Sequence, residues 1–191
     1  LGATGHTPES LEIELKWIDQ HIDNKPYGVD ILIPSDFHNK EESVSAKEIE
    51  AAIPPEHRAY VESILEKHNI DTTKLWDGKV GDTHGDNMRE VGATPILDVA
   101  LSHANCRMLV NALGVPPDFM LDKAKAAGVL VGALAGAKEH AIKHAKVGVD
   151  VIIVSGMEAG GHCGEVSTMV VLPEVLRALE PYGNIPVLAA G

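Results

Sequence analysis

The chain has 191 residues, 45% of them hydrophobic, which is enough to bury a sizeable core and argues against disorder. Its formal net charge of -12 argues against binding nucleic acid, which needs clustered lysines and arginines. Two cysteines cannot build a disulfide framework, and no apolar run reaches the roughly 20 residues of a membrane span. We therefore expect a soluble cytoplasmic protein with neither nucleic acid nor membrane as a partner.

The first predicted element is a helix. Thr7 is placed to cap it, Pro8 stands in its first turn, and apolar residues then recur at helical spacing up to Ile22. The apolar run YGVDILIP follows at residues 27–34, and it suits a strand that is buried on both faces.

Residues 35–107 interrupt this pattern. They hold a charged helical stretch, then the glycine- and aspartate-rich stretch WDGKVGDTHGDN, then another helix-like segment. We interpret this range as a helical excursion within a single domain, residues 1–191. It is either a lid over a site or a packed pair of surface helices, and the second interpretation is favoured. His84 stands between aspartates here, but the spacing lacks the alternation of a calcium loop, so we predict no metal site.

Strands and helices alternate through the second half of the chain. The predicted strands are RMLVNAL at 107–113, VLVGAL at 129–134, DVIIVS at 150–155 and PVLAA at 186–190, and the predicted helices are 116–127, 137–147 and 172–179. This alternation requires parallel strands with right-handed crossovers. No G-x-G-x-x-G pattern follows a strand, whereas small or polar residues such as Asn111, Ser155 and Gly191 end them. The pattern therefore favours a partial (β/α)8 barrel over an open dinucleotide-binding sheet.

One histidine is a candidate for catalysis. In VDVIIVSGMEAGGHCGE, residues 149–165, His162 follows a buried strand and a pair of glycines and has no apolar neighbours that would make it a core residue. Imidazole has an ordinary pKa of about 6.5, so His162 can accept a proton. Cys163 does not form a nucleophile–base pair with it, because adjacent residues on an extended turn point apart. Glu158 and Glu165 flank the histidine and either orient it or face solvent.

A second pair of histidines has metal-ligand spacing. His140 and His144 lie four residues apart on a predicted helix, but Glu139 precedes them and no third ligand completes an H-E-x-x-H pattern. We expect a solvent-facing helix surface here.

Three stretches carry a family resemblance: KPYGVDILIP, HAIKHAKVGVDVIIVSGMEAGGHCGEVSTMVVLPEV and IPVLAAG. In them HA, GVD, EAGGHxGE, PEV and PVLAAG follow one another in the order and spacing of a known family, over most of the chain outside residues 40–107. The chain resembles the nitronate monooxygenases, once called 2-nitropropane dioxygenases, which are flavin-dependent enzymes on a (β/α)8 barrel. By this resemblance the chain would run from the end of the second strand to the end of the seventh, and would be a fragment.

The resemblance also implies a cofactor, FMN, at the carboxyl ends of the strands. It would lie across Asn111, Ser155, Gly160, Gly161 and Gly191. Glycines would let the backbone approach the flat ring, and Gly191 would be the first of a pair whose N–H groups hold the phosphate.

The implied reaction is the oxidation of alkyl nitronates. His162 would lie near the reactive face of the flavin and remove a proton from the carbon beside the nitro group. The flavin would take electrons, O2 would react, and a carbonyl compound and nitrite would leave. The partners would be this small-molecule substrate and O2, with no metal.

Two positions depart from the family pattern. One branch has a lysine where this chain has Leu134, and an acidic residue or glutamine where it has Ser155, so two flavin contacts could be lost. Two rival functions therefore stay open. One is a flavin-dependent enoyl reductase of the same superfamily, and the other is a flavin- or phosphate-binding barrel without turnover.

Overall fold

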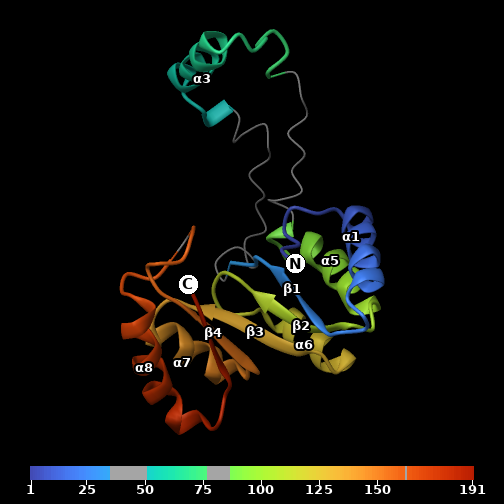
Figure 1. Cartoon of the computed structure of the whole chain (residues 1–191), viewed down its shortest axis with the longest axis vertical. Helices are drawn as coiled ribbons and strands as arrows, with labels where there is room; N and C mark the ends of the chain where they lie inside the picture. Colours follow the sequence, from blue (N-terminus) through green and yellow to red (C-terminus); the bar gives the residue numbers. More distant parts are fainter. Residues whose placement is uncertain (35–50, 77–86, 162) are drawn as a thin grey trace. The chain divides into compact units, whose positions relative to one another are not determined.

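The structure is a computed structural model that describes residues 1–34, 51–76, 87–161 and 163–191 (Figure 1). The chain divides into two compact units. Residues 1–39 and 83–191 form the first, and residues 40–82 form the second.

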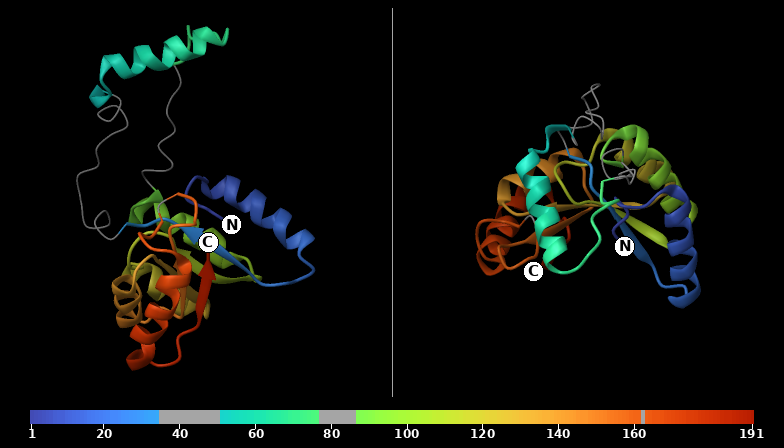
Figure 2. Two further views of the ribbon diagram at one scale, coloured as in Figure 1. Left: turned by 60° about the vertical axis from the view of Figure 1, so that its left-hand side comes forward. Right: turned by 90° about the horizontal axis from the view of Figure 1, so that it is seen from above.

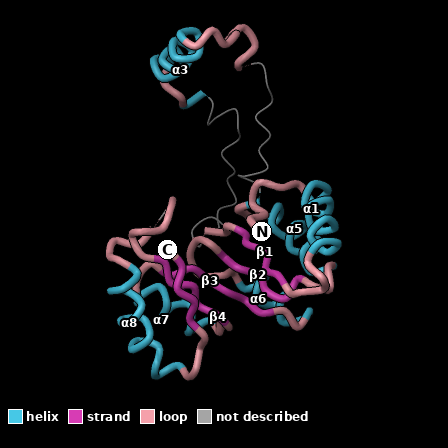
Figure 3. Tube along the Cα trace, in the orientation of Figure 1, coloured by secondary structure: helices cyan, strands magenta, loops and turns pink. Residues whose placement is uncertain are grey.

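The described part of the first unit contains a five-stranded sheet (Figure 3). Its strands are β1 (Tyr27–Ile31), β2 (Cys106–Asn111), β3 (Leu130–Ala135), β4 (Val151–Ser155) and β5 (Val187–Ala190). They lie in chain order and every neighbouring pair is parallel. A parallel bridge from Gly2 to Asp30 places the N-terminal segment beside β1. The predicted strands and their parallel pairing are confirmed.

Helices of the first unit cover one face of this sheet (Figure 2). They are α1 (Pro8–His21), α5 (Glu90–Ser102), α6 (Asp118–Ala127), α7 (Lys138–Val147) and α8 (Thr168–Leu179), and the short 3-10 helix η1 (Glu180–Tyr182) follows α8. Val131 belongs to the core cluster with residues of α1, α5 and α6, whereas Ala133 and Ala135 belong to the cluster with α7 and α8. These three residues alternate along β3 and so point to the same face. Helices on a single face are the arrangement of a barrel, since an open doubly wound sheet has helices on both faces.

Local signals explain three of the helix ends. Thr7 and Ser10 exchange side chain–backbone hydrogen bonds of 3.2 and 2.9 Å, a capping box that starts α1 as predicted. Helices α6 and α7 stop at Gly128 and Gly148, whose φ angles of 65° and 85° favour glycine. Helix α8 begins at Thr168, four residues before the predicted start at residue 172.

The helical excursion predicted for residues 35–107 includes parts of both units, and its boundaries stay a prediction. Within it, α5 packs in the first unit, where Ile96 and Leu97 are fully buried in the core. The second unit contains α3 (Pro55–Lys67), which has no buried residue. Side chains in the described part of the second unit make local contacts, such as the 2.5 Å hydrogen bond that Trp76 donates to Glu62. Among the described helices, none has the length and apolar character needed to cross a membrane.

Candidate functional site

The carboxyl ends of β4 and β5 bring two predicted site residues together. Ser155 pairs with Ala190 in the sheet, and its Oγ donates a 3.0 Å hydrogen bond to the Ala190 carbonyl. Gly191 follows directly, and a Cβ atom there would lie 2.9 Å from Oγ1 of Thr168 at the start of α8. Ser155 and Gly191 thus lie at the edge where (β/α)8 proteins bind their ligands.

The β4–α8 loop, residues 156–167, closes tightly at its base. The Met157 amide donates a 2.9 Å hydrogen bond to the Val166 carbonyl, which joins the two sides of the loop. At Gly164 an added Cβ would lie 2.6 Å from the carbonyl oxygen of Gly136, the residue after β3. The loop base therefore packs backbone against backbone on the end of β3.

The tip of this loop carries the predicted glycines. Gly160 and Gly161 are exposed, and an added Cβ at either would meet no atom within 4 Å. Gly161 has a φ angle of 76°, a conformation that favours glycine. His162, the predicted catalytic residue, lies outside the described residues. The tip thus offers open backbone that a flat ligand could approach.

Glu158 has a defined contact that the sequence analysis did not identify. Its Oε2 accepts hydrogen bonds from the amide and the hydroxyl of Thr168, at 2.8 and 3.0 Å. These bonds, above all the one from the backbone amide, hold the pKa of Glu158 below its ordinary range. The contact links residues ten apart, and no short sequence signature predicts it. Glu165, on the other side of the histidine, is exposed.

Asn111 is fully buried and bonds to backbone groups. Its Oδ1 accepts from the amide of Ile33 at 2.9 Å, and its Nδ2 donates to the carbonyls of Ile33, Leu113 and Gly114 at 3.1 to 3.2 Å. Asn111 lies in one row of the sheet with Ala133, on the helix-covered face, whereas alternation along β4 puts Ser155 on the opposite, inner face. The structure does not bring Asn111 together with Ser155, and its role as a cofactor contact stays a prediction.

The inner face near this edge is apolar. Leu134, Ile153 and Leu188 form one row across β3, β4 and β5, and Ser155 and Ala190 form the next row. The two positions that depart from the family pattern, Leu134 and Ser155, thus lie on the same face in neighbouring rows. With the open glycines at the loop tip, this surface fits the flat, largely apolar ring of a flavin.

His144 corrects one expectation, because it is not on a solvent-facing surface. His140 is exposed, but His144 is 1% exposed and packs behind β3, where Nε2 lies 2.9 Å from the Leu134 carbonyl. Burial lowers the pKa of His144, so the ring is neutral and Nε2 donates. Within the described part of the chain, no three His, Cys, Asp or Glu side chains gather as a metal site would need.

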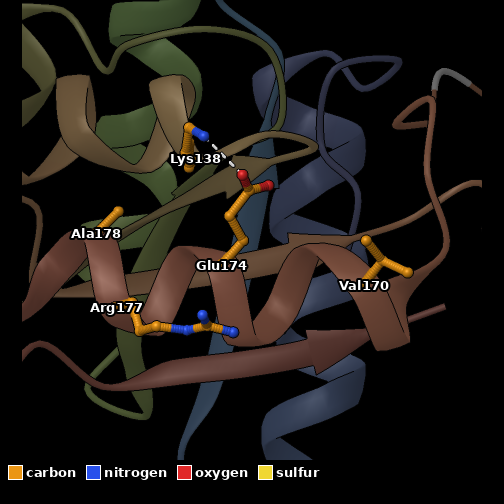
Figure 4. A pocket seen from close by; sticks show the side chains of 5 residues that line it. All are labelled: Lys138, Val170, Glu174, Arg177 and Ala178. Carbon is orange, nitrogen blue, oxygen red and sulfur yellow. Dashed lines mark hydrogen bonds and ion pairs between the residues drawn. The ribbon is translucent and has the colours of Figure 1, made fainter.

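A surface hollow of about 570 Å³ lies between α7 and α8 (Figure 4). A 2.6 Å ion pair between Lys138 and Glu174 crosses it. Val170, Arg177 and Ala178 complete its lining, so no predicted site residue contributes. The hollow belongs to the helix layer and is separate from the candidate site.

The opposite, amino-terminal end of the strands holds a polar cluster that sequence analysis also missed. His103 is 9% exposed, and its Nδ1 lies 2.6 Å from Asp19 and its Nε2 3.0 Å from Glu12. Asn105 donates to the other oxygen of Asp19 at 3.2 Å. These partners are 84 to 91 residues apart in the chain, so spacing gives no signal.

Comparisons with known proteins agree with this geometry. A family model described as nitronate monooxygenase matches residues 1–191. A putative monooxygenase of Mycobacterium tuberculosis, Rv1533, is 43% identical over the whole chain, which covers 50% of that protein. A solved nitroalkane oxidase from Streptomyces ansochromogenes aligns with a TM-score of 0.67 and 25% identity over 100% of this chain and 50% of its own.

A further relative matches a shorter stretch. It is (3aS,4S,5R,7aS)-5-hydroxy-7a-methyl-1-oxo-octahydro-1H-indene-4-carboxyl-CoA dehydrogenase of Rhodococcus jostii, 49% identical over 40% of this chain and 20% of that protein. The chain spans about half the length of the relatives that match it throughout.

Proposed function

Since this chain belongs to the nitronate monooxygenase family, we propose that it forms part of a flavin-dependent oxidoreductase that oxidises alkyl nitronates with O2 to carbonyl compounds and nitrite. The observation that carries the proposal is the position of the EAGGHCGE motif. It lies on the β4–α8 loop, at the carboxyl edge of a parallel sheet whose helices cover one face. That edge is where the enzymes of this fold place their chemistry.

We propose FMN as the flavin. The open backbone of Gly160 and Gly161 would lie against the ring, and Gly191 would contribute to the phosphate site. Ser155 supports β5 beside this site, since its hydroxyl donates to the Ala190 carbonyl. The flavin, when bound, supplies the electron acceptor for the substrate and the group that reacts with O2. In keeping with its composition, we place the protein in the cytoplasm.

Proton removal is the step that we assign to His162. A neutral nitroalkane carries an acidic proton on the carbon beside the nitro group, and an imidazole with a pKa near neutrality can take it. The apolar row of Leu134, Ile153 and Leu188 would exclude water from the alkyl end of the substrate. A nitronate has already lost this proton and does not need the base.

The test replaces His162 with Asn or Ala in the full-length protein. Oxygen uptake with neutral nitroalkanes should fall by roughly 100- to 10,000-fold, the contribution of a positioned base, while uptake with pre-formed nitronates should fall far less. The flavin absorbance spectrum serves as the control, because the glycine contacts are unchanged. Equal losses with both substrates, with flavin still bound, would show that His162 is not the proton acceptor.

A second candidate is the oxidation of a coenzyme A thioester. The 49% identity to the CoA dehydrogenase of Rhodococcus jostii over 40% of this chain favours it over the other rivals. Oxygen uptake with nitronates, flavin reduction by acyl-CoA esters and oxidation of reduced pyridine nucleotides separate this candidate from nitronate oxidation and from enoyl reduction. Tight flavin binding without any of these activities would identify a barrel without turnover.

A further inference from the structure

The start of α8 receives a cap from an unusual distance. Ser167 occupies the N-cap position but makes no side-chain hydrogen bond to the helix. Instead the carboxylate of Glu158, ten residues before Thr168, accepts the Thr168 amide at 2.8 Å. The start of a helix favours an acidic group, because the first amides of the helix have no partner within it and the helix dipole is positive there.

The same carboxylate ties the two ends of the β4–α8 loop together. Thr168 Oγ1 accepts a 3.1 Å hydrogen bond from the Gly156 amide and donates a 3.0 Å bond to Glu158. The order Gly156 amide, Thr168 hydroxyl, Glu158 carboxylate uses each donor and acceptor in its ordinary sense. Glu158 therefore fixes the first residue of the loop through the first residue of the helix.

The backbones of Gly156 and Thr168 pack closely at the loop base. A Cβ atom at Gly156 would lie 2.2 Å from the Thr168 nitrogen, so the two backbones are in direct contact. The loop tip lacks such support, since an added Cβ at Gly160 or Gly161 would meet no atom within 4 Å. The position of the tip thus depends on the base, which Glu158 holds together with the hydrogen bond from the Met157 amide to the Val166 carbonyl.

We propose that Glu158 is a positioning residue for the candidate site: its carboxylate clamps the β4–α8 loop to α8 and so sets where the glycine tip meets the ligand. The proposal rests on the proposed function, since it assigns the tip to that reaction. The carboxylate of Glu158 bonds to Thr168, so we assign it an effect through the loop and no part in proton transfer.

The experiment compares four variants of the full-length protein. Glu158→Gln weakens the clamp by removing its charge, and Thr168→Val removes the hydroxyl that joins Gly156 to Glu158. Thr168→Ser keeps the hydroxyl, and Glu165→Gln removes an exposed charge at the other side of the loop. Hydrogen–deuterium exchange of peptides covering residues 156–168 measures the clamp, and kcat/KM for a pre-formed nitronate measures its effect on the site.

In Glu158→Gln and Thr168→Val, exchange over residues 156–168 should rise about tenfold and kcat/KM should fall by about ten- to a hundredfold, the usual cost of a displaced active-site group. Thr168→Ser and Glu165→Gln should stay within about twofold of the wild type. The pH profile of kcat/KM should keep its shape in all four, because Glu158 transfers no proton in the reaction.

Unchanged exchange in Glu158→Gln and Thr168→Val would overturn the clamp. Raised exchange with kcat/KM equal to that of Glu165→Gln would overturn its role in positioning the site. Wild-type protein that consumes no oxygen with nitronates would overturn the proposed function alone, and the exchange data would still decide whether the clamp exists.

Discussion

Carboxylate side chains make hydrogen bonds at both ends of the sheet, but these bonds have different structural effects. At the amino-terminal end, His103 is buried and bonds to carboxylates on α1, so a polar contact joins elements far apart in the chain. At the carboxyl-terminal end, the carboxylate of Glu158 is exposed and holds a glycine loop to the helix that follows it. The amino-terminal cluster is structural, whereas the carboxyl-terminal end combines structural contacts with open backbone at the loop tip, as expected of a (β/α)8 barrel, which binds its ligands at that end.

The protonation of His103 follows from its neighbours. Burial lowers the pKa of His103, but hydrogen bonds to Asp19 and Glu12 outweigh it, so the pKa is raised overall. The same hydrogen bonds to His103 lower the pKa of Asp19 and of Glu12. The ring is thus held as a cation between two carboxylates.

The largest effect should come from Gly156 at the carboxyl-terminal end. Gly156→Ala would place a Cβ 2.2 Å from the Thr168 nitrogen, and the backbone shift should cost about 3 kcal/mol or more of unfolding free energy. Gly160→Ala is the matched control at the open tip and should cost under about 0.5 kcal/mol. Urea unfolding of the full-length variants measures both. Similar losses at the two glycines would erase the distinction between rigid base and open tip.

Asn111 should show that part of the carboxyl-terminal end is also structural. Asn111→Ala would leave the amide of Ile33 and the carbonyls of Leu113 and Gly114 without this partner, at a cost of about 2 to 3 kcal/mol. The urea midpoint should fall accordingly. A stable variant with weakened flavin binding would instead support the predicted role of Asn111 as a cofactor contact.

A somewhat smaller loss is expected at the amino-terminal end. His103→Leu should lower the free energy of unfolding by about 2 kcal/mol, since it leaves Asp19 without its charged partner in a partly buried position. Flavin affinity should be unchanged, because the cluster lies at the other end of the strands. A variant that unfolds like the wild type but binds flavin poorly would contradict the separation of the two ends.

The smallest expected effect is the pH dependence of the stability lost in His103→Leu. The raised pKa of His103 means that its ionic contribution is fully present below the ordinary value of 6.5 and disappears as pH rises through the folded-state value. The lowered pKa values of Asp19 and Glu12 remove the contribution again in acid. The difference in urea midpoint between wild type and His103→Leu should therefore peak between these limits. A difference that grows steadily above neutral pH would show that His103 is neutral when folded.

Much of the fold was predictable because it depends on local pattern. Apolar runs, the Thr7 cap and the helices between strands predicted the elements and their parallel pairing. The face of a strand was harder to predict, since RMLVNAL is apolar on both sides and nothing in it shows that Asn111 points toward the helices. His144 could have been found, because it lies three residues from the buried Ala141 on α7.

The contacts that support the site and the His103 cluster were harder to predict from the sequence. His103 meets its partners across more than 80 residues, and only the folded chain brings them together. The Glu158 contact spans ten residues of irregular loop, beyond the reach of helix-capping patterns. The position of the glycine motif after β4 was predictable, and what holds the loop was not.

The contrast between Gly156 and Gly160 also bears on how this protein could acquire new substrates. An added Cβ at position 160 meets no atom within 4 Å, so a small side chain there would face the proposed ligand and not the rest of the protein, whereas the φ angle of 76° at Gly161 admits mainly glycine, asparagine or aspartate. Mutational drift, or a laboratory library, can thus vary the chemistry at the loop tip one residue at a time. Position 156 does not tolerate such changes, because a Cβ there would clash with the Thr168 nitrogen. Substitutions that alter selectivity without a loss of folding are therefore expected at the loop tip.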